Sequence, residues 1–129
     1  MARIKEYVIN FAPIPWKRID GRTFYDKQHH EKISTGFYLN QQHGNDPQFT
    51  KPIQVETTFY MPIPKIIKDR KSSKWDATFP KIDYLQQFIF DAITDTGVIW
   101  KDDRIIASLI AKKLYDKNPR THIIITELE

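Results

Sequence analysis

Apolar and polar residues alternate along two stretches of the chain, a period of two that is typical of β-strands with one buried face. The first stretch runs from Tyr7 to Phe11 and stops at Pro13 and Pro15, which cannot donate the hydrogen bonds of a sheet. The second runs from Lys51 to Pro64, with one face formed by Ile53, Val55, Thr57 and Phe59. Two further strands are expected at 104–115 and at 121–128, joined by a turn over 116–120.

A helical period follows Pro80, where the recurring apolar residues are Ile82, Leu85, Ile89, Ala92 and Ile93. This pattern predicts a helix from Ile82 to Thr94 that ends at Gly97, because glycine readily adopts the left-handed conformation. A second helix is expected through the thirties, with Asp26 as its cap, and 65–79 is expected to be a loop. Together these elements predict an α+β fold: a single domain over residues 1–129, with a mixed β-sheet and helices packed on it.

Composition narrows the class of protein. The chain has 129 residues and 40% hydrophobic content, which suits one core. It has no cysteine, which excludes disulfides, thiol chemistry and cysteine-ligated zinc, and it has no apolar run of roughly 18 residues. A cytoplasmic protein without a membrane partner is expected. The formal charge of +4 suits a polyanionic partner but is also common in proteins without one.

Common catalytic motifs do not occur in the sequence. There is no phosphate-binding G-x-x-x-x-G-K-[ST] loop, no G-x-S-x-G elbow and no H-E-x-x-H zinc motif. The adjacent His29 and His30 lack the i, i+4 spacing of helical metal ligands, so surface positions are expected for them and for His43 and His122.

The separated aspartates are the candidate chemistry. A helix carries the chain about 18 Å over the twelve residues that follow Asp83. After Gly97, six extended residues from Val98 to Asp103 return it by about 20 Å. This geometry places Asp102 or Asp103 beside Asp83, and clustered carboxylates suit Mg²⁺. Aspartates at a helix start and at a strand start are equally ordinary capping and turn residues.

These residues also fall in the register of a known signature, an Asp-x-Asp-Asn-Leu-x-Lys run that opens a helix continuing into Asp-Ala-Leu, followed by a glycine and an aromatic residue before Asp-Asp. The matching positions are Asp83, Leu85, Asp91-Ala92-Ile93, Gly97, Trp100 and Asp102-Asp103. The opening Pro13-Ile14-Pro15-Trp16-Lys17-Arg18 and the Phe24-Tyr25 pair are similar too. In these features the chain resembles the RusA family of Holliday junction resolvases, small phage-associated endonucleases.

The resemblance implies a function and a set of site residues. It implies a homodimeric, Mg²⁺-dependent endodeoxyribonuclease that acts on four-way branched DNA in recombination and repair. The family's site uses three aspartates around Mg²⁺ and a lysine. Asp83 and Asp103 carry over as catalytic and metal-binding residues, with Asp102 as a reserve ligand.

The chain departs from the signature at three positions: Lys81 replaces the first aspartate, Tyr84 the asparagine and Gln87 the lysine. Exchanging a carboxylate for an ammonium group changes the local charge by two units, and a unit charge pair at about 4 Å is worth about 4 kcal/mol at an effective dielectric of 20. Weaker metal binding and weaker catalysis are expected. Three alternatives follow. Asp76 or Asp102 substitutes as a metal ligand, or Lys81 itself contacts the scissile phosphate. In the third, the chain is a non-catalytic module that binds branched DNA or another protein.

Basic residues supply the candidate DNA contacts, and these are Lys17, Arg18, Lys68, Arg70, Lys71, Lys74 and Lys81, with Gln87 as a polar contact. The stretch from Lys65 to Lys74 is interpreted either as a DNA-binding loop or as a solvated loop. Trp16, Phe24 and Tyr25 lie among basic residues and either stack on exposed bases or pack in the core.

Overall fold

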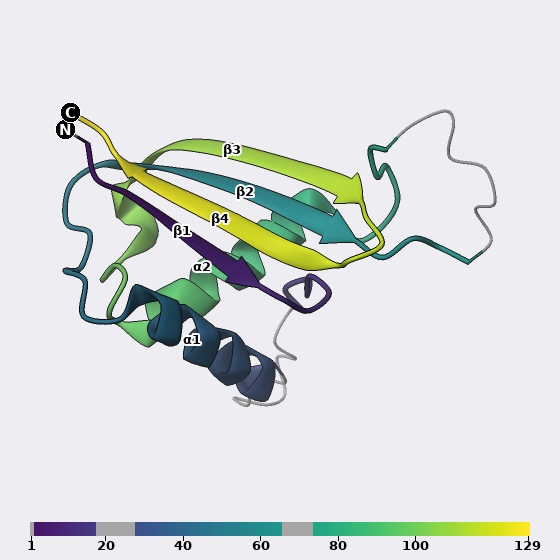
Figure 1. The fold of residues 1–129 in the computed structure, drawn as a ribbon, viewed down its shortest axis with the longest axis horizontal. Helices are drawn as coiled ribbons and strands as arrows, with labels where there is room; N and C mark the ends of the chain where they lie inside the picture. Colours follow the sequence, from purple (N-terminus) through teal and green to yellow (C-terminus); the bar gives the residue numbers. More distant parts are fainter. Residues whose placement is uncertain (1, 18–27, 66–73) are drawn as a thin grey trace.

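A four-stranded sheet carries two helices in the computed structural model, which describes residues 2–17, 28–65 and 74–129 (Figure 1). The elements in chain order are β1 (Ile4–Ile9), α1 (His29–His43), β2 (Ile53–Met61), α2 (Ile82–Thr96), the one-turn 3₁₀ helix η1 (Asp103–Ile105), β3 (Ile106–Tyr115) and β4 (Arg120–Glu127). The strand order is β1-β4-β2-β3, with β2 and β3 parallel and the other neighbours antiparallel. The fold is therefore α+β with a mixed sheet, as the sequence predicts.

Both helices cover the same face of the sheet (Figure 1). The strand residues that point toward them alternate with residues of the opposite face, because side chains of a strand alternate between its two faces. On β2 the helix-facing residues are those the alternation predicts, and all four are buried: Ile53, Val55, Thr57 and Phe59. The opposite face of the sheet carries no helix among the described residues.

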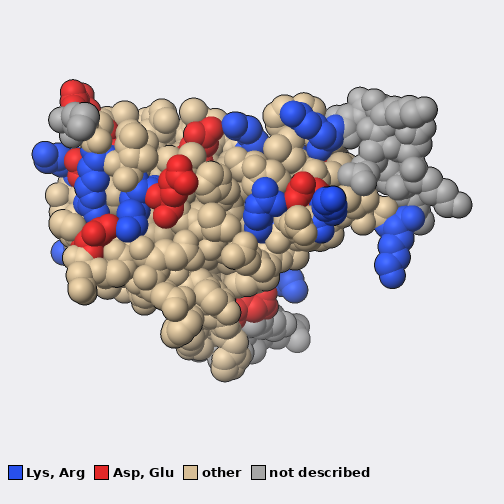
Figure 2. All heavy atoms as spheres, in the orientation of Figure 1, with Lys and Arg blue, Asp and Glu red and all other residues tan. Residues whose placement is uncertain are grey.

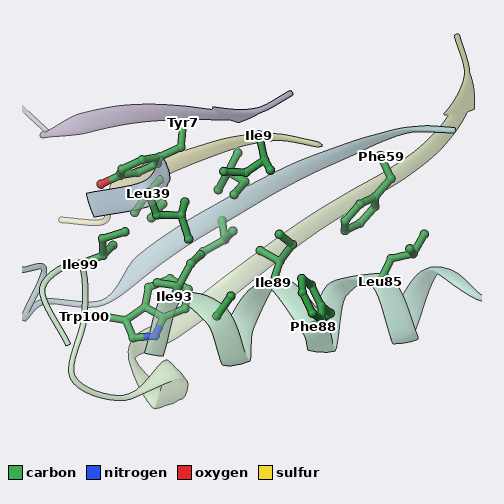
Figure 3. Packing of buried hydrophobic residues seen from close by; sticks show 14 of the residues in the cluster. Tyr7, Ile9, Leu39, Phe59, Leu85, Phe88, Ile89, Ile93, Ile99 and Trp100 are labelled. Atoms are coloured by element: carbon green, nitrogen blue, oxygen red, sulfur yellow. The ribbon is translucent and has the colours of Figure 1, made fainter. Parts of the chain in front are cut away.

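The core lies between α2 and the sheet (Figure 3). The buried side chains of α2 are Leu85, Gln86, Phe88, Ile89, Ala92 and Ile93. The predicted helix is confirmed and extends two residues beyond the expected end, to Thr96, before Gly97 adopts a left-handed φ of 69°. Trp100 is fully buried beside this end of the helix, where its indole Nε1 donates to Thr94 Oγ1 across 2.7 Å.

The return after Gly97 differs from the expected strand. Residues from Val98 to Asp102 form bends and an isolated bridge between Trp100 and Phe49, and η1 follows before β3 begins at Ile106. The prediction of six extended residues was therefore wrong. Burial of Ile99 and Trp100 explains the difference, because anchoring both side chains in the core holds the chain at this end of α2.

The N-terminal elements are shifted from their predicted bounds. β1 starts at Ile4 rather than Tyr7, because its pairing with β4 runs from Ile4 opposite Thr126 to Ile9 opposite Thr121. α1 begins after Gln28, and the expected cap Asp26 lies outside the described residues.

His43 is buried, so its expected surface position was wrong. Only 1% of it is exposed, and its Nδ1 lies 2.6 Å from the Tyr7 hydroxyl. His29 and His30 are exposed, as expected. Within the described ranges, neither helix is long and apolar enough to cross a lipid bilayer.

Candidate functional site

A polar stripe runs along α2, formed by Asp83, Gln87 and Asp91. These residues are spaced i, i+4 and i+8, which places them on one face of the helix. The side-chain amide of Gln87 donates to Asp91 Oδ1 across 2.7 Å, and Lys32 Nζ of α1 lies 3.6 Å from Asp91 Oδ2. Asp83 is exposed in the first turn, where Oδ1 accepts from the backbone N–H of Tyr84 across 3.1 Å. Gln87, an expected phosphate contact, is thus already hydrogen-bonded within the stripe.

Asp103 stands at the start of η1 and is partly buried. Burial raises the pKa of its carboxyl, and the neighbouring charge of Asp102 and then that of Asp91 raise it further. The pKa of Asp102 is shifted in the opposite direction, below its ordinary value. Its side chain accepts a hydrogen bond from the backbone N–H of Arg104 across 2.9 Å and lies 3.0 Å from Arg104 Nε, and both contacts favour the ionised form. Asp103 is therefore a carboxylate in an acidic environment, subject to the negative charges of Asp102 and Asp91.

The negative charges of Asp102 and Asp91 act on Asp103, whereas Asp83 lies in the first turn of α2, toward the other end of the helix. Figure 3 shows Leu85 near one end of the helix and Trp100, just before η1, at the other. Eight helical residues, about 12 Å, separate Asp83 from Asp91. Asp83 lines a cavity together with Ala111, Lys112 and Lys113 of β3 and therefore lies beside the second half of that strand. A single ion shared by Asp83 and Asp103 stays a prediction.

A groove between α2 and β3 lies beside the part of the stripe formed by Asp83 and Gln87. Its apolar walls are Ile82, Phe90, Leu109 and Ala111, and Asp83 and Gln87 also line it. The groove encloses about 240 Å³. We call this feature the α2–β3 groove. It provides an apolar surface beside the acidic side chains.

A larger cavity of about 590 Å³ opens at the Asp83 end of α2, and we call it the aromatic cavity. Trp75 and Phe79 stand at its wall with 53% and 84% of their surfaces exposed, and Lys81 lines it beside Asp83. Aromatic faces beside a lysine suit the stacked bases and phosphates of single-stranded nucleic acid. The sequence predicts a loop over residues 65–79 and gives no sign that Trp75 and Phe79 stand together at a cavity.

Asp76 is buried in the same cavity and already has partners. Its Oδ1 accepts from the Thr78 N–H at 2.7 Å and from the Thr78 hydroxyl at 2.6 Å, and Lys113 Nζ lies 3.9 Å from Oδ2. Burial raises the pKa of Asp76, but these hydrogen bonds and Lys113 outweigh it and keep the pKa below its ordinary value. A structural role thus accounts for Asp76, which was considered as a substitute metal ligand.

The described basic candidates are exposed at this end of the molecule. Lys81 precedes α2 with its Nζ 5.9 Å from the Tyr84 ring centroid, and Lys74 Nζ lies 6.0 Å from that of Trp75. Lys17 is exposed as well. On the face seen in Figure 2, acidic and basic side chains are intermixed at the left, and mainly basic ones gather at the right, where β2 and β3 end. The remaining candidates lie outside the described residues: Arg18, Lys68, Arg70 and Lys71.

The donor set fits a hydrated Mg²⁺ rather than a fully protein-ligated ion. Within residues 2–17, 28–65 and 74–129, no group of three His, Cys, Asp or Glu side chains is arranged to hold a metal ion. Mg²⁺, however, keeps several waters and commonly binds through one or two carboxylates together with substrate phosphate. The charges of Asp102 and Asp91 act unfavourably on Asp103, and a cation at Asp103 relieves this repulsion.

Two comparisons with known proteins bear on the family of the chain. The sequence signature of the family described as endodeoxyribonuclease RusA matches residues 15–126. The uncharacterized protein YqaN of Bacillus subtilis (strain 168) is 28% identical over 138 residues, which cover 95% of this chain and 96% of that protein.

Proposed function

Because the chain belongs to the RusA family of endodeoxyribonucleases, we propose that it is a Holliday junction resolvase that cleaves four-way branched DNA in recombination and repair. The observation that carries the proposal is the acidic environment of Asp103, which lies inside the matched range together with the whole α2 stripe. We place the protein in the cytoplasm, with access to DNA, and take residues 1–129 as one RusA-like domain.

We assign metal binding to Asp103 and Asp102, and we take Asp83 as the second acidic residue that cleavage requires. A bound Mg²⁺ would polarise the scissile phosphate and favour ionisation of the attacking water. Asp83 lines both the α2–β3 groove and the aromatic cavity, so a DNA strand that follows the groove passes its exposed carboxylate. Asp103 is the group that a cation would stabilise most directly, because its ionised form is disfavoured without one.

Positive charge beside Asp83 supports DNA binding. Lys81 and Lys74 lie at or beside the wall of the aromatic cavity, and both are exposed. We propose that Lys81 contacts a phosphate there, since it stands next to Asp83 at the start of α2. The contacts expected from Lys17, Arg18, Lys68, Arg70 and Lys71 belong to the same proposal, as does that of Gln87. Phosphate contacts of this kind predict an affinity that falls steeply with salt.

A second candidate function is binding of branched DNA without cleavage. It is favoured by the bond between Gln87 and Asp91, which occupies the side chain standing where the family has a lysine. It is also favoured by Lys81, whose positive charge stands where the family has an aspartate. Both features weaken transition-state stabilisation without removing the DNA-binding surface.

Cleavage of a labelled four-way junction in Mg²⁺ or Mn²⁺ separates the two candidates. We expect the wild type to cleave and Asp103→Asn and Asp83→Asn to lose about 100-fold or more of the rate. Glu6→Gln is the matched control, because Glu6 is an exposed carboxylate of β1, at the sheet edge opposite β3, and it is expected to cleave normally. Binding that prefers the junction over linear duplex, without cleavage, would establish the second candidate. Equal affinity for both DNAs and no cleavage would contradict both.

We also propose a homodimer, because a four-way junction has two equivalent strands to cut and a twofold enzyme presents two equivalent sites.

A further inference from the structure

β3 forms one edge of the sheet, and most of its outer side is open. At its C-terminal end, Trp75 forms an antiparallel bridge with Leu114. In this bridge the Asp76 N–H donates to the Lys113 carbonyl at 3.1 Å, and the Tyr115 N–H donates to the Lys74 carbonyl at 2.8 Å. At the other end of the strand, η1 interrupts the extended backbone. The free edge therefore spans residues 106–112.

The bridge also reveals which backbone groups point outward. Successive residues of a strand direct their N–H and C=O groups to opposite edges, so the outward groups of Lys113 and Tyr115 set the pattern for the strand. Ala107, Leu109 and Ala111 share that orientation. Within the described part of the chain, their N–H and C=O groups have no backbone partner on the outer side. They offer hydrogen bonds to another strand.

Apart from Lys112 at its end, which pairs with Glu56 at 3.1 Å, the free edge lacks the features by which soluble proteins protect such strands. Charged side chains and prolines usually block an exposed edge, and the run IASLIA from Ile106 to Ala111 contains neither. Leu109 is 48% exposed and Ile110 is 40% exposed. An uncharged, apolar strand edge of this kind is a surface built to be paired.

We propose that β3 pairs with β3 of a second copy of this chain, antiparallel, with Leu109 opposite Leu109 of the partner subunit. The register follows from the bounds of the free edge, because Leu109 is the midpoint of residues 106–112. Around this centre, Ala107 lies opposite Ala111 of the partner subunit, and the reverse pair is equivalent. Each of these residue pairs exchanges two N–H···O=C bonds, so every outward group of the free edge is satisfied.

Pairing in this way sets the geometry of the whole dimer. Two strands that meet edge to edge and antiparallel are related by a twofold axis perpendicular to the sheet. Both pairs of helices then lie on the same face of one continuous sheet of eight strands, since each copy contributes four. Leu109 lines the α2–β3 groove, so the two grooves meet at the axis. The inference names the surface of the homodimer proposed above, and it stands on the strand edge rather than on nuclease activity.

Cysteine cross-linking tests the register directly, because the chain has no native cysteine. Residues opposite each other in a hydrogen-bonded antiparallel pair have Cα atoms about 5.5 Å apart. A disulfide also needs Cβ atoms about 3.5–4.5 Å apart, closer than a hydrogen-bonded pair brings them, so a short bis-maleimide is used in place of oxidation. We expect Leu109→Cys to become mostly covalent dimer with this reagent. Phe37→Cys is the matched control, because Phe37 is an exposed apolar residue of α1 with 62% exposure. It is expected to remain monomeric on a non-reducing gel.

Either of two results would overturn the assignment: a Leu109→Cys protein that stays monomeric with the bis-maleimide, or a Phe37→Cys protein that cross-links at least as fast.

Sedimentation measures the same contact without a covalent bond. Leu109→Lys places like charges opposite each other across the axis, and we expect it to raise the Kd of the dimer about tenfold or more. Phe37→Lys is expected to leave the Kd unchanged. The pair Ala107→Glu with Ala111→Lys places opposite charges together and is expected to dimerise better than Ala107→Lys with Ala111→Lys. Circular dichroism checks that each variant is folded.

A wild-type chain that is monomeric at about 100 μM, roughly 100-fold above a micromolar Kd, contradicts the proposal. Loss of cleavage in a variant that remains dimeric bears only on the nuclease proposal, so the two can fail separately.

Discussion

Gln87 and Asp91 are joined side chain to side chain on α2, with Gln87 Nε2 donating to Asp91 Oδ1 across 2.7 Å. The bond fixes the Gln87 amide within the polar stripe of α2, between Asp83 and Asp91. A neutral amide at this position orders the stripe but does not offset its charge. The family's lysine would do both, which makes position 87 the natural place to alter activity.

Restoring the family residues at positions 81 and 87 is expected to raise cleavage. Gln87→Lys adds an ammonium group between carboxylates, and Lys81→Asp adds an acidic ligand beside Asp83. At about 4 Å each charge interaction is worth up to about 4 kcal/mol at an effective dielectric of 20, less where the groups are solvated. We expect the double variant to cleave a four-way junction at least tenfold faster than the wild type, measured as single-turnover rates in Mg²⁺.

The control for this gain is the double variant that also carries Asp103→Asn. If the added rate survives that substitution, the cleavage does not depend on Asp103 and the assignment of the metal site is wrong.

Asp103→Asn is expected to stabilise the metal-free protein while removing its response to metal. The pKa of Asp103 is raised by burial and by Asp102 and Asp91, so the ionised form is disfavoured in the folded state. The folded-state pKa lies above the unfolded one, and this group therefore opposes folding increasingly as pH rises through that range. Removing the charge at pH 7 is expected to increase the free energy of unfolding by a few tenths to about 1 kcal/mol, because the site is partly solvated.

Thermal melts with Mn²⁺ give the second half of this test. Binding to the folded state stabilises it by about 2.7 kcal/mol at 100 times the Kd, so Tm is expected to rise in the wild type. In Asp103→Asn the rise is expected to vanish, whereas Glu6→Gln is expected to keep it. An equal Tm shift in Asp103→Asn would show that the ion binds elsewhere.

The predictable part of the fold is the part governed by local periodicity. The helix from Ile82 and its end at Gly97 follow from spacing and from one backbone conformation, and both are confirmed. The same holds for the alternating face of β2. The path after Gly97 was not predictable in this way, because it depends on long-range packing: Trp100 bridges to Phe49 and donates to Thr94.

The candidate site shows the same division. The i, i+4 spacing of Asp83, Gln87 and Asp91 is visible in the sequence and places them on one helix face. The influence of the Asp91 charge on Asp103 was not visible in the sequence, since it depends on where η1 begins. Lys113 was missed as well. It stands in a strand at a position facing the helices, and the only signal was a lysine where alternation expects an apolar residue.

Lys113 is expected to be essential for stability. It is 9% exposed, its ammonium group donates to the carbonyl of Thr78 and to that of Pro80 at 2.7 Å, and it lies 3.9 Å from Asp76. Lys113→Met leaves a buried carboxylate and two carbonyls without their donor, and breaking a buried pair in this way costs about 3–5 kcal/mol. Urea denaturation of the variant measures the loss, and Lys112→Met on the opposite face serves as control. A cost below about 1 kcal/mol for Lys113→Met would mean that water replaces the ammonium group.

The Tyr7–His43 contact predicts how stability changes with pH. Burial lowers the pKa of His43, and it raises that of Tyr7, whose hydroxyl lies 2.6 Å from His43 Nδ1. The Nε2 of His43 is buried without a hydrogen-bond partner, so a proton added there has no acceptor. Because the folded-state pKa of His43 lies below the unfolded value of about 6.5, its contribution is complete above that value and is lost as pH falls below it.

We therefore expect the free energy of unfolding to decrease between pH 7 and pH 5, with this one group contributing at most about 1.4 kcal/mol per pH unit. His43→Gln is expected to be less stable at pH 7 but to show a shallower decrease, because glutamine does not titrate. His122→Gln, on the opposite face of the sheet from the helices, is the control and is expected to retain most of the wild-type slope. Urea denaturation at pH 7, 6 and 5 gives all three slopes. If His43→Gln keeps the wild-type slope, the carboxylates alone set the pH dependence, and the buried histidine does not.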